Sequence, residues 1–173
     1  MLTRTSVLIV SAALALTGCS SRDQATPINT QSSDGAPALT GTPVSVEVSG
    51  EYGTQPEVVI TPGDPVTELE VTDVIVGEGD PLPAGATLTA DYVGYGGATG
   101  QMFDASWVRG EPATFPLSNV ILGWQEGLVG MQVGGRRLLV IPAELGYGNN
   151  PPPGSGIEPG ETLIFVVDLV SFE

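Results

Sequence analysis

Lysine and histidine are both absent from this chain of 173 residues, and basic charge of any kind is scarce. The five basic residues are all arginines, against 20 acidic residues, which gives a net charge of −15 at neutral pH. Binding to nucleic acid needs a basic stripe that neutralises phosphates, so that class of function is excluded. The acidic surface would also be repelled by anionic lipid headgroups, so any attachment to a membrane has to be covalent or hydrophobic.

The lack of histidine also removes the most common general base and the most common zinc ligand. Only one cysteine is present, so no disulfide can form within the chain. Catalytic groups of the Ser-His-Asp or Cys-His type are excluded, and we expect no metal site and no cofactor. Any chemistry must therefore proceed without a paired nucleophile and base.

The first 18 residues have the pattern of an export signal. Arg4 supplies a positive start, and residues 7–16 form an apolar run that is too short for a membrane-spanning helix. Residues 16–19 (LTGC) resemble the bacterial lipobox, in which the thiol of the final cysteine, here Cys19, is lipidated. The alternative is an ordinary cleavage site beside a spare cysteine. We expect an exported protein anchored by lipid to the outer face of the cell membrane, or facing the periplasm in a host with two membranes.

Residues 19–66 are expected to form the lipid-anchored N-terminus and a flexible tether. Residues 20–43 are rich in Ser, Thr, Pro, Gly, Asn and Gln and carry almost no large apolar side chain. Two short apolar stretches follow, an alternating one at residues 44–48 and another at residues 57–60. These stretches either pair as an extra hairpin or form an extended lead-in to the domain, and the pattern alone does not choose between the two.

Residues 67–173 carry the pattern of a β-rich domain. Period-two alternation and flanking Gly or Pro residues predict strands at residues 69–76, 87–95, 101–104, 114–117, 136–141 and 162–172. One short helix is expected at about residues 119–129, with Ser118 as its N-cap and with Ile121, Trp124 and Leu128 on one face. Its glycines make packing necessary for its stability. The predicted fold is α+β, a half-open antiparallel β-sheet wrapped around one short helix.

Several local strings in this region become recognisable by their order and spacing. They are YVG at residues 92–94, FDAS at 103–106, VILGW at 120–124, GLVGM at 127–131, IP at 141–142 with LGYG at 145–148, and TLIFVVDL at 162–169. In this order they resemble the FKBP-type peptidyl-prolyl cis-trans isomerase family over residues 67–173. The resemblance implies an enzyme that accelerates rotation about X–Pro bonds by desolvation in an apolar aromatic pocket, without a covalent intermediate.

The resemblance also assigns residues to that prolyl pocket. Catalytic roles are implied for Tyr92, Asp104 and Tyr147. The substrate-binding residues implied are Phe103, Val120, Ile121, Trp124, Ile157 and Phe165. Among these, Trp124 would form the floor and the Ile121 backbone N–H would bind a substrate carbonyl, while Arg109 would support the site by pairing with Asp104. Periodicity alone would place Trp124 in a plain core.

Two positions depart from the family pattern. Ala113 stands where the family often has a pocket phenylalanine, and residues 157–159 are Ile-Glu-Pro in place of Ile-Pro-Pro. Both changes predict a weaker wall and weaker binding of FK-type macrolides. They also support an alternative function, a non-catalytic FKBP-like binding module or holdase chaperone. In either case we expect a monomer whose partners are proline-containing unfolded or folding polypeptides.

Overall fold

The computed structural model describes residues 41–173, which fold around a six-stranded antiparallel sheet. The strands are β3 (Glu70–Ile75), β4 (Thr87–Gly96), β5 (Met102–Ala105), β6 (Ala113–Pro116), β7 (Arg136–Ile141) and β8 (Leu163–Phe172). Their order is β3-β7-β8-β4, after which β5 and β6 both pair with the outer side of β4. The predicted α+β fold with a half-open antiparallel sheet is confirmed.

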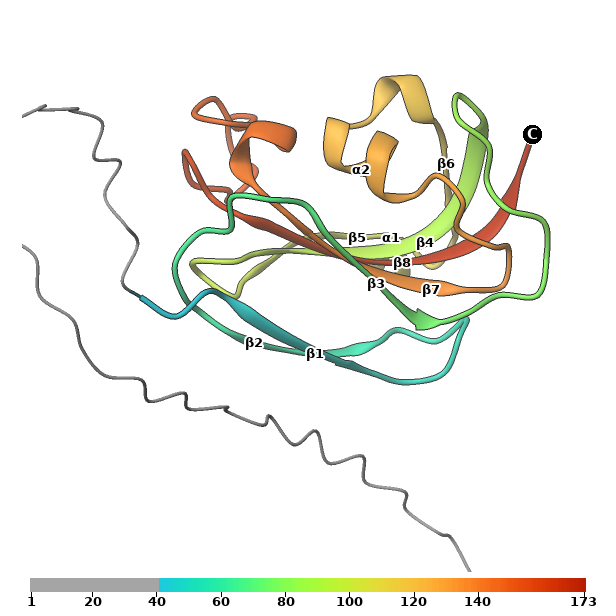
Figure 1. Cartoon of the computed structure of the whole chain (residues 1–173), viewed down its shortest axis with the longest axis horizontal. Coiled ribbons are helices and arrows are strands. Elements are labelled where there is room, and N and C mark those ends of the chain that lie inside the picture. The colour runs from blue at the N-terminus through green and yellow to red at the C-terminus, as the bar shows by residue number, and fades with distance from the viewer. Residues whose placement is uncertain (1–40) are drawn as a thin grey trace, which may run out of the picture. The chain divides into compact units, whose positions relative to one another are not determined.

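One helix, α2 (Leu122–Gly127), lies across one face of the sheet (Figure 1). Its Trp124 side chain is buried against the sheet. A Cβ on Gly123 would lie only 2.4 Å from Cγ2 of Ile141, and a Cβ on Gly127 would lie 2.7 Å from another β7 side chain. The glycines that weaken this helix in isolation therefore allow it to pack closely on β7.

The helix begins later than the sequence predicts. A 3-10 turn, η1 (Leu117–Asn119), comes first, and the backbone is then extended at Val120 and Ile121. Ser118 lies inside that turn, where its hydroxyl contacts the Asn119 side chain. The predicted N-cap is therefore wrong, since the residue at the N-cap position is Ile121, which makes no side-chain capping bond. The other short turns are α1 (Ser106–Arg109) and η2 (Ala143–Leu145).

The two apolar stretches before the domain form a hairpin of β1 (Ser45–Ser49) and β2 (Glu57–Thr61). This is the first of the two alternatives that the sequence left open. The hairpin covers the face of the sheet opposite α2 (Figure 1). The sequence predicts that residues 44–66 belong to the tether. In the structure they extend the folded domain instead, because the inner face of the hairpin packs on the sheet.

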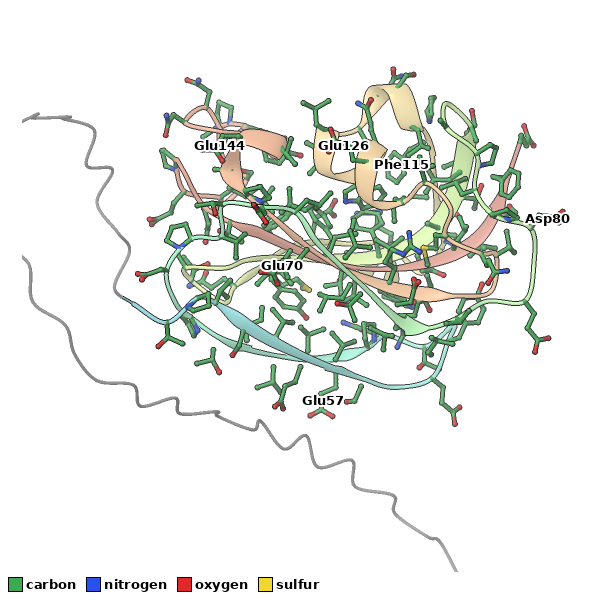
Figure 2. The ribbon with its side chains drawn as sticks, in the orientation of Figure 1. Glu57, Glu70, Asp80, Phe115, Glu126 and Glu144 are labelled. Atoms are coloured by element: carbon green, nitrogen blue, oxygen red, sulfur yellow. The ribbon has the colours of Figure 1, made fainter. Side chains whose placement is uncertain are left out.

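The predicted tether up to residue 40, the export signal at residues 1–18 and Cys19 all lie outside the described residues. Within residues 41–173, no helix is long and apolar enough to span a membrane. Acidic side chains of this part, such as Glu57, Glu126 and Glu144, point outward from its surface (Figure 2).

Each face of the sheet carries a hydrophobic core. The core between the sheet and α2 receives the alternating β8 side chains that the sequence predicts, Leu163, Phe165, Val167 and Leu169. The intervening Ile164 and Val166 are also fully buried, in a second core beneath the hairpin. The sheet is therefore the central layer between α2 and the hairpin, which explains why β8 is apolar on both faces.

A buried ion pair joins the hairpin to the sheet. Arg136 on β7 and Asp168 on β8 are both fully buried, and the Arg136 Nε lies 2.6 Å from the Asp168 Oδ1. The hairpin turn closes over this pair, since the Gly53 N–H donates to Asp168 at 2.8 Å and Arg136 donates to the Thr54 carbonyl at 2.6 Å. Buried charges are stable only when they are well paired, so the turn and the ion pair support each other.

Replacing Asp168 by Asn should destabilise the domain by about 3–5 kcal/mol, because the Arg136 charge would stay buried without its partner. Asp73→Asn is the matched control. It removes the partner of Arg137, but the Asp73 side chain is 42% exposed, so this loss should be at most about 1 kcal/mol. Denaturant unfolding measures both free energies. Equal losses would show that burial is not what makes the Arg136 pair important.

Candidate active site

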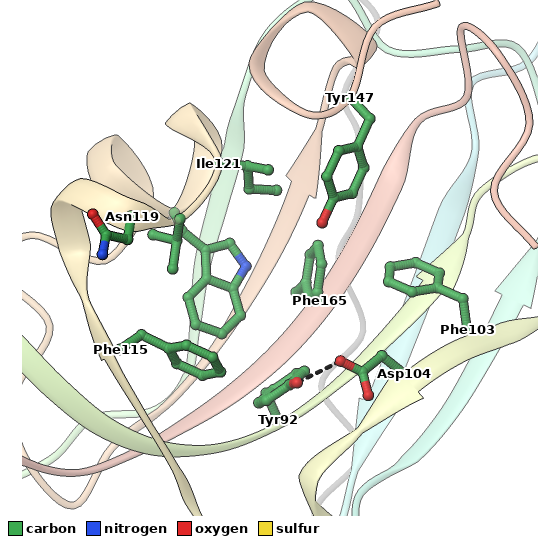
Figure 3. Close-up of a pocket in the computed structure, with 10 residues that line it drawn as sticks. Tyr92, Phe103, Asp104, Phe115, Asn119, Ile121, Tyr147 and Phe165 are labelled. Atoms are coloured by element: carbon green, nitrogen blue, oxygen red, sulfur yellow. Dashed lines mark hydrogen bonds between the residues drawn. The ribbon is translucent and has the colours of Figure 1, made fainter. Parts of the chain in front are cut away.

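A pocket of about 270 Å³ opens between the sheet, α2 and the loop that follows η2 (Figure 3). Its lining comes from elements that are far apart in the sequence, which the antiparallel sheet brings together. The lining residues are Tyr92, Phe103, Asp104, Phe115, Asn119, Val120, Ile121, Trp124, Tyr147 and Phe165. Most of them are aromatic or aliphatic, as is usual for pockets that bind small apolar groups.

Aromatic rings form the base and walls of the pocket by edge-to-face packing. The Trp124 ring centroid lies 5.3 Å from that of Phe165, 5.4 Å from that of Tyr92 and 5.9 Å from that of Phe115. Phe103 packs on Phe165 with a centroid distance of 5.5 Å. These perpendicular arrangements are the preferred geometry of aromatic pairs, so the rings hold one another in place. They leave an apolar recess whose size is fixed by the packing.

Gly94 on β4 makes room for two of these rings. A Cβ at this position would lie 2.6 Å from Cζ of Phe103 and 2.8 Å from Cε1 of Phe165. Real Cβ atoms do not approach other atoms so closely, so any side chain here would push the rings away from their present positions. Glycine at residue 94 is therefore part of how the pocket is built.

Tyr92, Asp104 and Arg109 form a hydrogen-bonded group at the polar side of the pocket. The Tyr92 hydroxyl donates to Asp104 at 2.5 Å, and Arg109 donates to Asp104 at 2.7 Å and to the Tyr92 hydroxyl oxygen at 2.8 Å. The Arg109 guanidinium also lies over the Tyr92 ring, 5.5 Å from its centroid. The supporting role implied for Arg109 is consistent with these contacts.

These contacts fix the protonation state of the group. Burial, followed by the hydrogen bond to Asp104, raises the pKa of Tyr92 to about 12. Burial works toward a higher pKa for Asp104, but the hydrogen bonds from Tyr92 and Arg109 outweigh it and hold that pKa below its usual value. At neutral pH the group is a neutral phenol bound to a carboxylate–guanidinium pair.

Tyr147 contributes a second hydroxyl from the loop after η2. Its side chain points into the pocket toward Phe165, and it makes no hydrogen bond with the other lining residues (Figure 3). Burial, together with the nearby charge of Asp104, raises the pKa of Tyr147 above its ordinary value. At neutral pH Tyr147 therefore offers a protonated hydroxyl that can donate to a bound carbonyl.

All but one of the residues predicted to be catalytic or substrate-binding line the pocket together. The exception is Ile157, which is buried in the core beside the pocket and does not line it. Gly156 has a positive φ of 77°, and the Ile157 N–H donates to the Ser155 hydroxyl at 3.3 Å. This tight local turn directs Ile157 into the core, so its contribution to the site is indirect.

Phe115 and Asn119 line the pocket although the sequence strings did not identify them. Phe115 follows Ala113 by two residues on β6, so both lie on the inward face of that strand. The ring of Phe115 contacts Tyr92 with a centroid distance of 5.8 Å. The wall expected to be weak at Ala113 is thus built in part by Phe115, which the alternation of β6 could have revealed. Asn119 ends the η1 turn, for which no sequence signal exists.

Several known proteins are similar to this chain in sequence and in fold. A family model described as FKBP-type peptidyl-prolyl cis-trans isomerase matches residues 79–170. The FK506-binding protein of Streptomyces anulatus is 50% identical over 119 residues, which are 68% of this chain and 96% of that protein. The probable FK506-binding protein of Corynebacterium glutamicum is 46% identical over 118 residues, covering 68% and 98% of the two chains. The crystal structure of FkpA from Escherichia coli superposes with a TM-score of 0.57 at 41% identity, over 62% of this chain and 49% of that one.

The fold, the aromatic pocket and these relatives together define a class of protein, the peptidyl-prolyl isomerases. Within that class, the chain belongs to the FKBP-type peptidyl-prolyl cis-trans isomerase family. It is an enzyme that catalyses cis–trans isomerisation of X–Pro bonds, as the sequence strings indicated.

Gly94→Ala should lower kcat/KM roughly tenfold while the protein still folds, because the added methyl displaces Phe103 and Phe165 at a cost of about 1–3 kcal/mol. Gly97→Ala, in the turn after β4, is the control. Its Cβ would approach Thr162 no closer than 3.1 Å, and no pocket ring is involved. A protease-coupled isomerase assay measures both variants, and wild-type activity in Gly94→Ala would contradict this account of the pocket.

Proposed function

We propose that this enzyme accelerates rotation about X–Pro bonds by taking the prolyl amide out of water. Resonance gives the planar amide a rotational barrier of ~18–20 kcal/mol, and uncatalysed exchange takes roughly tens to hundreds of seconds. The planar form is more polar than the twisted transition state, in which the conjugation of nitrogen with the carbonyl is broken. An apolar pocket therefore favours the twisted form, and each ~1.4 kcal/mol of that preference is a tenfold gain in rate.

The observation that carries this proposal is that Asp104, the one charged residue lining the described pocket, is held by two side-chain hydrogen bonds. Its carboxylate accepts hydrogen bonds from Tyr92 and from Arg109. The Tyr92 hydroxyl both donates to Asp104 and accepts from Arg109. The pKa of Asp104 is held low and that of Tyr92 is raised to about 12, so neither group is suited to act as a general base or a nucleophile at neutral pH, which supports a mechanism without a covalent intermediate.

Donor groups on other lining residues remain for the substrate. We propose that the Tyr147 hydroxyl and the Ile121 backbone N–H bind the carbonyls on either side of the proline and so orient the bond. Trp124 would form the floor beneath the prolyl ring, and Phe103, Phe165 and the ring of Tyr92 would form the walls. The Trp124 indole N–H is buried and makes no hydrogen bond within residues 41–173, so it is a further donor that a bound substrate can satisfy.

Exported or cell-surface polypeptides are the clients we propose, with the enzyme anchored by lipid at Cys19. The support is the apolar run at residues 7–16 followed by the lipobox-like string at residues 16–19. Each buried CH₂ of a lipid chain contributes about 0.8 kcal/mol, so two long chains would hold the protein stably on the outer face of the membrane. In a host with two membranes the domain would face the periplasm.

FK-type macrolides are proposed as competitors for the same pocket, because two bacterial relatives are FK506-binding proteins by name. The alternative function, a binding module without turnover, loses the support of a weak wall at Ala113, because Phe115 fills part of that place.

We also propose that the enzyme acts as a monomer. In the described domain α2 and the β1–β2 hairpin already cover both faces of the sheet.

Trp107→Phe provides a direct test of the pocket, because Trp124 is then the only tryptophan in the chain. Trp107 packs in the second core, away from the pocket. A prolyl peptide should change the fluorescence of this variant, and an FK-type macrolide should compete with the peptide. If prolyl ligands left the fluorescence of Trp124 unchanged, the binding site would have to lie elsewhere.

In the Trp107→Phe variant, the further change Tyr147→Phe should lower kcat/KM about threefold to tenfold, because one hydrogen bond to the substrate is lost. Tyr95→Phe is the matched control, because that tyrosine packs in the second core. It should keep full activity. If the wild-type rate does not exceed the buffer rate, desolvation in this pocket is not catalytic.

Cys19→Ala should move the full-length protein from the membrane fraction to the soluble fraction, because the thiol that would carry the lipid is lost. Isomerase activity should be unchanged, since the pocket lies entirely within residues 92–165. Fractionation of cells followed by the peptide assay measures both properties. Retention of the variant on membranes would contradict the lipid anchor while leaving the isomerase mechanism intact.

A further inference from the structure

The outer side of β4 is paired with two separate strands, and the pairing is broken between them. β6 pairs with β4 from Thr87 to Ala90, and β5 pairs with it from Val93 to Tyr95. The chain leaves the sheet after β5 to form the single turn α1 before β6 begins. On this side Asp91 and Tyr92 therefore have no strand beside them, although on the other side β8 runs past both without interruption.

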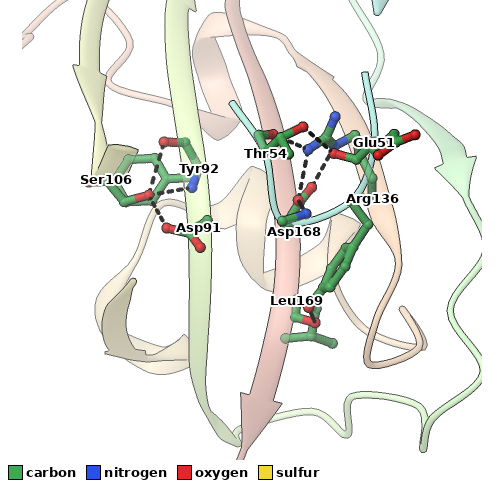
Figure 4. A network of polar contacts seen from close by, with 10 residues as sticks. Glu51, Thr54, Asp91, Tyr92, Ser106, Arg136, Asp168 and Leu169 are labelled. Atoms are coloured by element: carbon green, nitrogen blue, oxygen red, sulfur yellow. Dashed lines mark hydrogen bonds and ion pairs between the residues drawn. The ribbon is translucent and has the colours of Figure 1, made fainter. Parts of the chain in front are cut away.

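A serine side chain takes the place of the missing strand. Ser106 is fully buried, and its hydroxyl oxygen accepts the backbone N–H of Tyr92 at 2.9 Å. The same hydroxyl donates to the Asp91 carboxylate at 2.7 Å (Figure 4). A buried backbone N–H without an acceptor is costly, so this contact satisfies a group that the broken ladder would otherwise leave open. The hydroxyl also lies 3.4 Å from the Tyr92 carbonyl oxygen.

Ser106 also sits at the centre of the segment that carries the polar side of the active site. Asp104 lies two residues before it and Arg109 three residues after it, and both hydrogen-bond to the Tyr92 hydroxyl. The α1 turn between them has no side-chain N-cap of its own. The Ser106 hydroxyl is therefore a direct link between the Tyr92 backbone and the turn that places Asp104 and Arg109 on the Tyr92 ring.

We propose that Ser106 is a positioning residue for the isomerase reaction, which sets the register of Tyr92 against Asp104 and Arg109 without touching the substrate. The inference rests on the pocket proposed above. Removal of the hydroxyl would leave the Tyr92 N–H unpaired and free the α1 turn to shift. The Tyr92–Asp104 hydrogen bond would then lengthen, and the wall that Tyr92 forms beside Trp124 would lose its fixed place.

Ser106→Ala in the full chain tests this, with two readouts. We expect kcat/KM to fall about threefold to tenfold, as for one buried hydrogen bond lost. We also expect the ¹³C signal of the Tyr92 phenol to move, and its titration to shift from about 12 toward the ordinary value near 10. Tyr92→Phe identifies that signal and gives the activity without the hydroxyl. Thr89→Ala is the matched control, since it removes the exposed Thr89–Thr114 hydrogen bond of 2.9 Å on the same strand.

Ser106→Cys leaves no cavity, since its side chain is slightly larger, and it weakens the acceptor, so it decides the question if Ser106→Ala does not fold. A folded Ala or Cys variant with wild-type kcat/KM, or with lost activity but an unchanged Tyr92 signal, would overturn the proposal. The two proposals fail in different ways. If Tyr92→Phe is as active as wild type, the pocket assignment fails, whereas the Tyr92 signal still reports whether Ser106 positions that residue.

Discussion

The pairing of β4 with β8 is the constraint on which the pocket and its support both depend. The ladder runs from the Leu88–Phe172 pair to the Gly96–Leu163 pair. Because side chains alternate along a strand, this register turns Tyr92 and Phe165 toward α2 and turns Val93 and Val166 toward the hairpin. A slip of one residue would exchange the two faces of a strand. The aromatic wall and the second core are thus set by the register that the ladder keeps from the Ala90–Leu169 pair onward.

Charge is kept away from the reacting bond by pairing. Within residues 41–173 each arginine has a carboxylate partner, Arg109 with Asp104, Arg136 with Asp168 and Arg137 with Asp73. Only the first of these pairs reaches the pocket, where it holds the Tyr92 phenol in place. An enzyme that works by removing an amide from water needs such a surrounding, since an unpaired charge in the recess would bring water with it.

Local patterns in the sequence predicted the strands well, because alternation and flanking glycines are decided by neighbouring residues. They also place Trp124 on the apolar face of the helix and Phe165 on an alternating strand, and the family resemblance gives these residues their role. Ser118 was misassigned because capping depends on where the chain stops being extended. Ile157 was expected in the pocket and Phe115 was not identified, because loop geometry and packing across the sheet decide which side chain reaches the pocket. The hairpin stayed undecided, since its partner face lies on distant strands.

The contact between the hairpin turn and β8 has a consequence for the order of folding. Gly53 and Asp168 are separated by 115 positions in the chain, so the hairpin is synthesised early but its anchor arrives with the last strand. An isolated two-stranded hairpin is marginally stable in water. The hairpin therefore has nothing to dock on until β8 has inserted between β4 and β7, and its docking marks the completion of the sheet. Until then, the apolar inner faces of the sheet and the hairpin are both open to other chains.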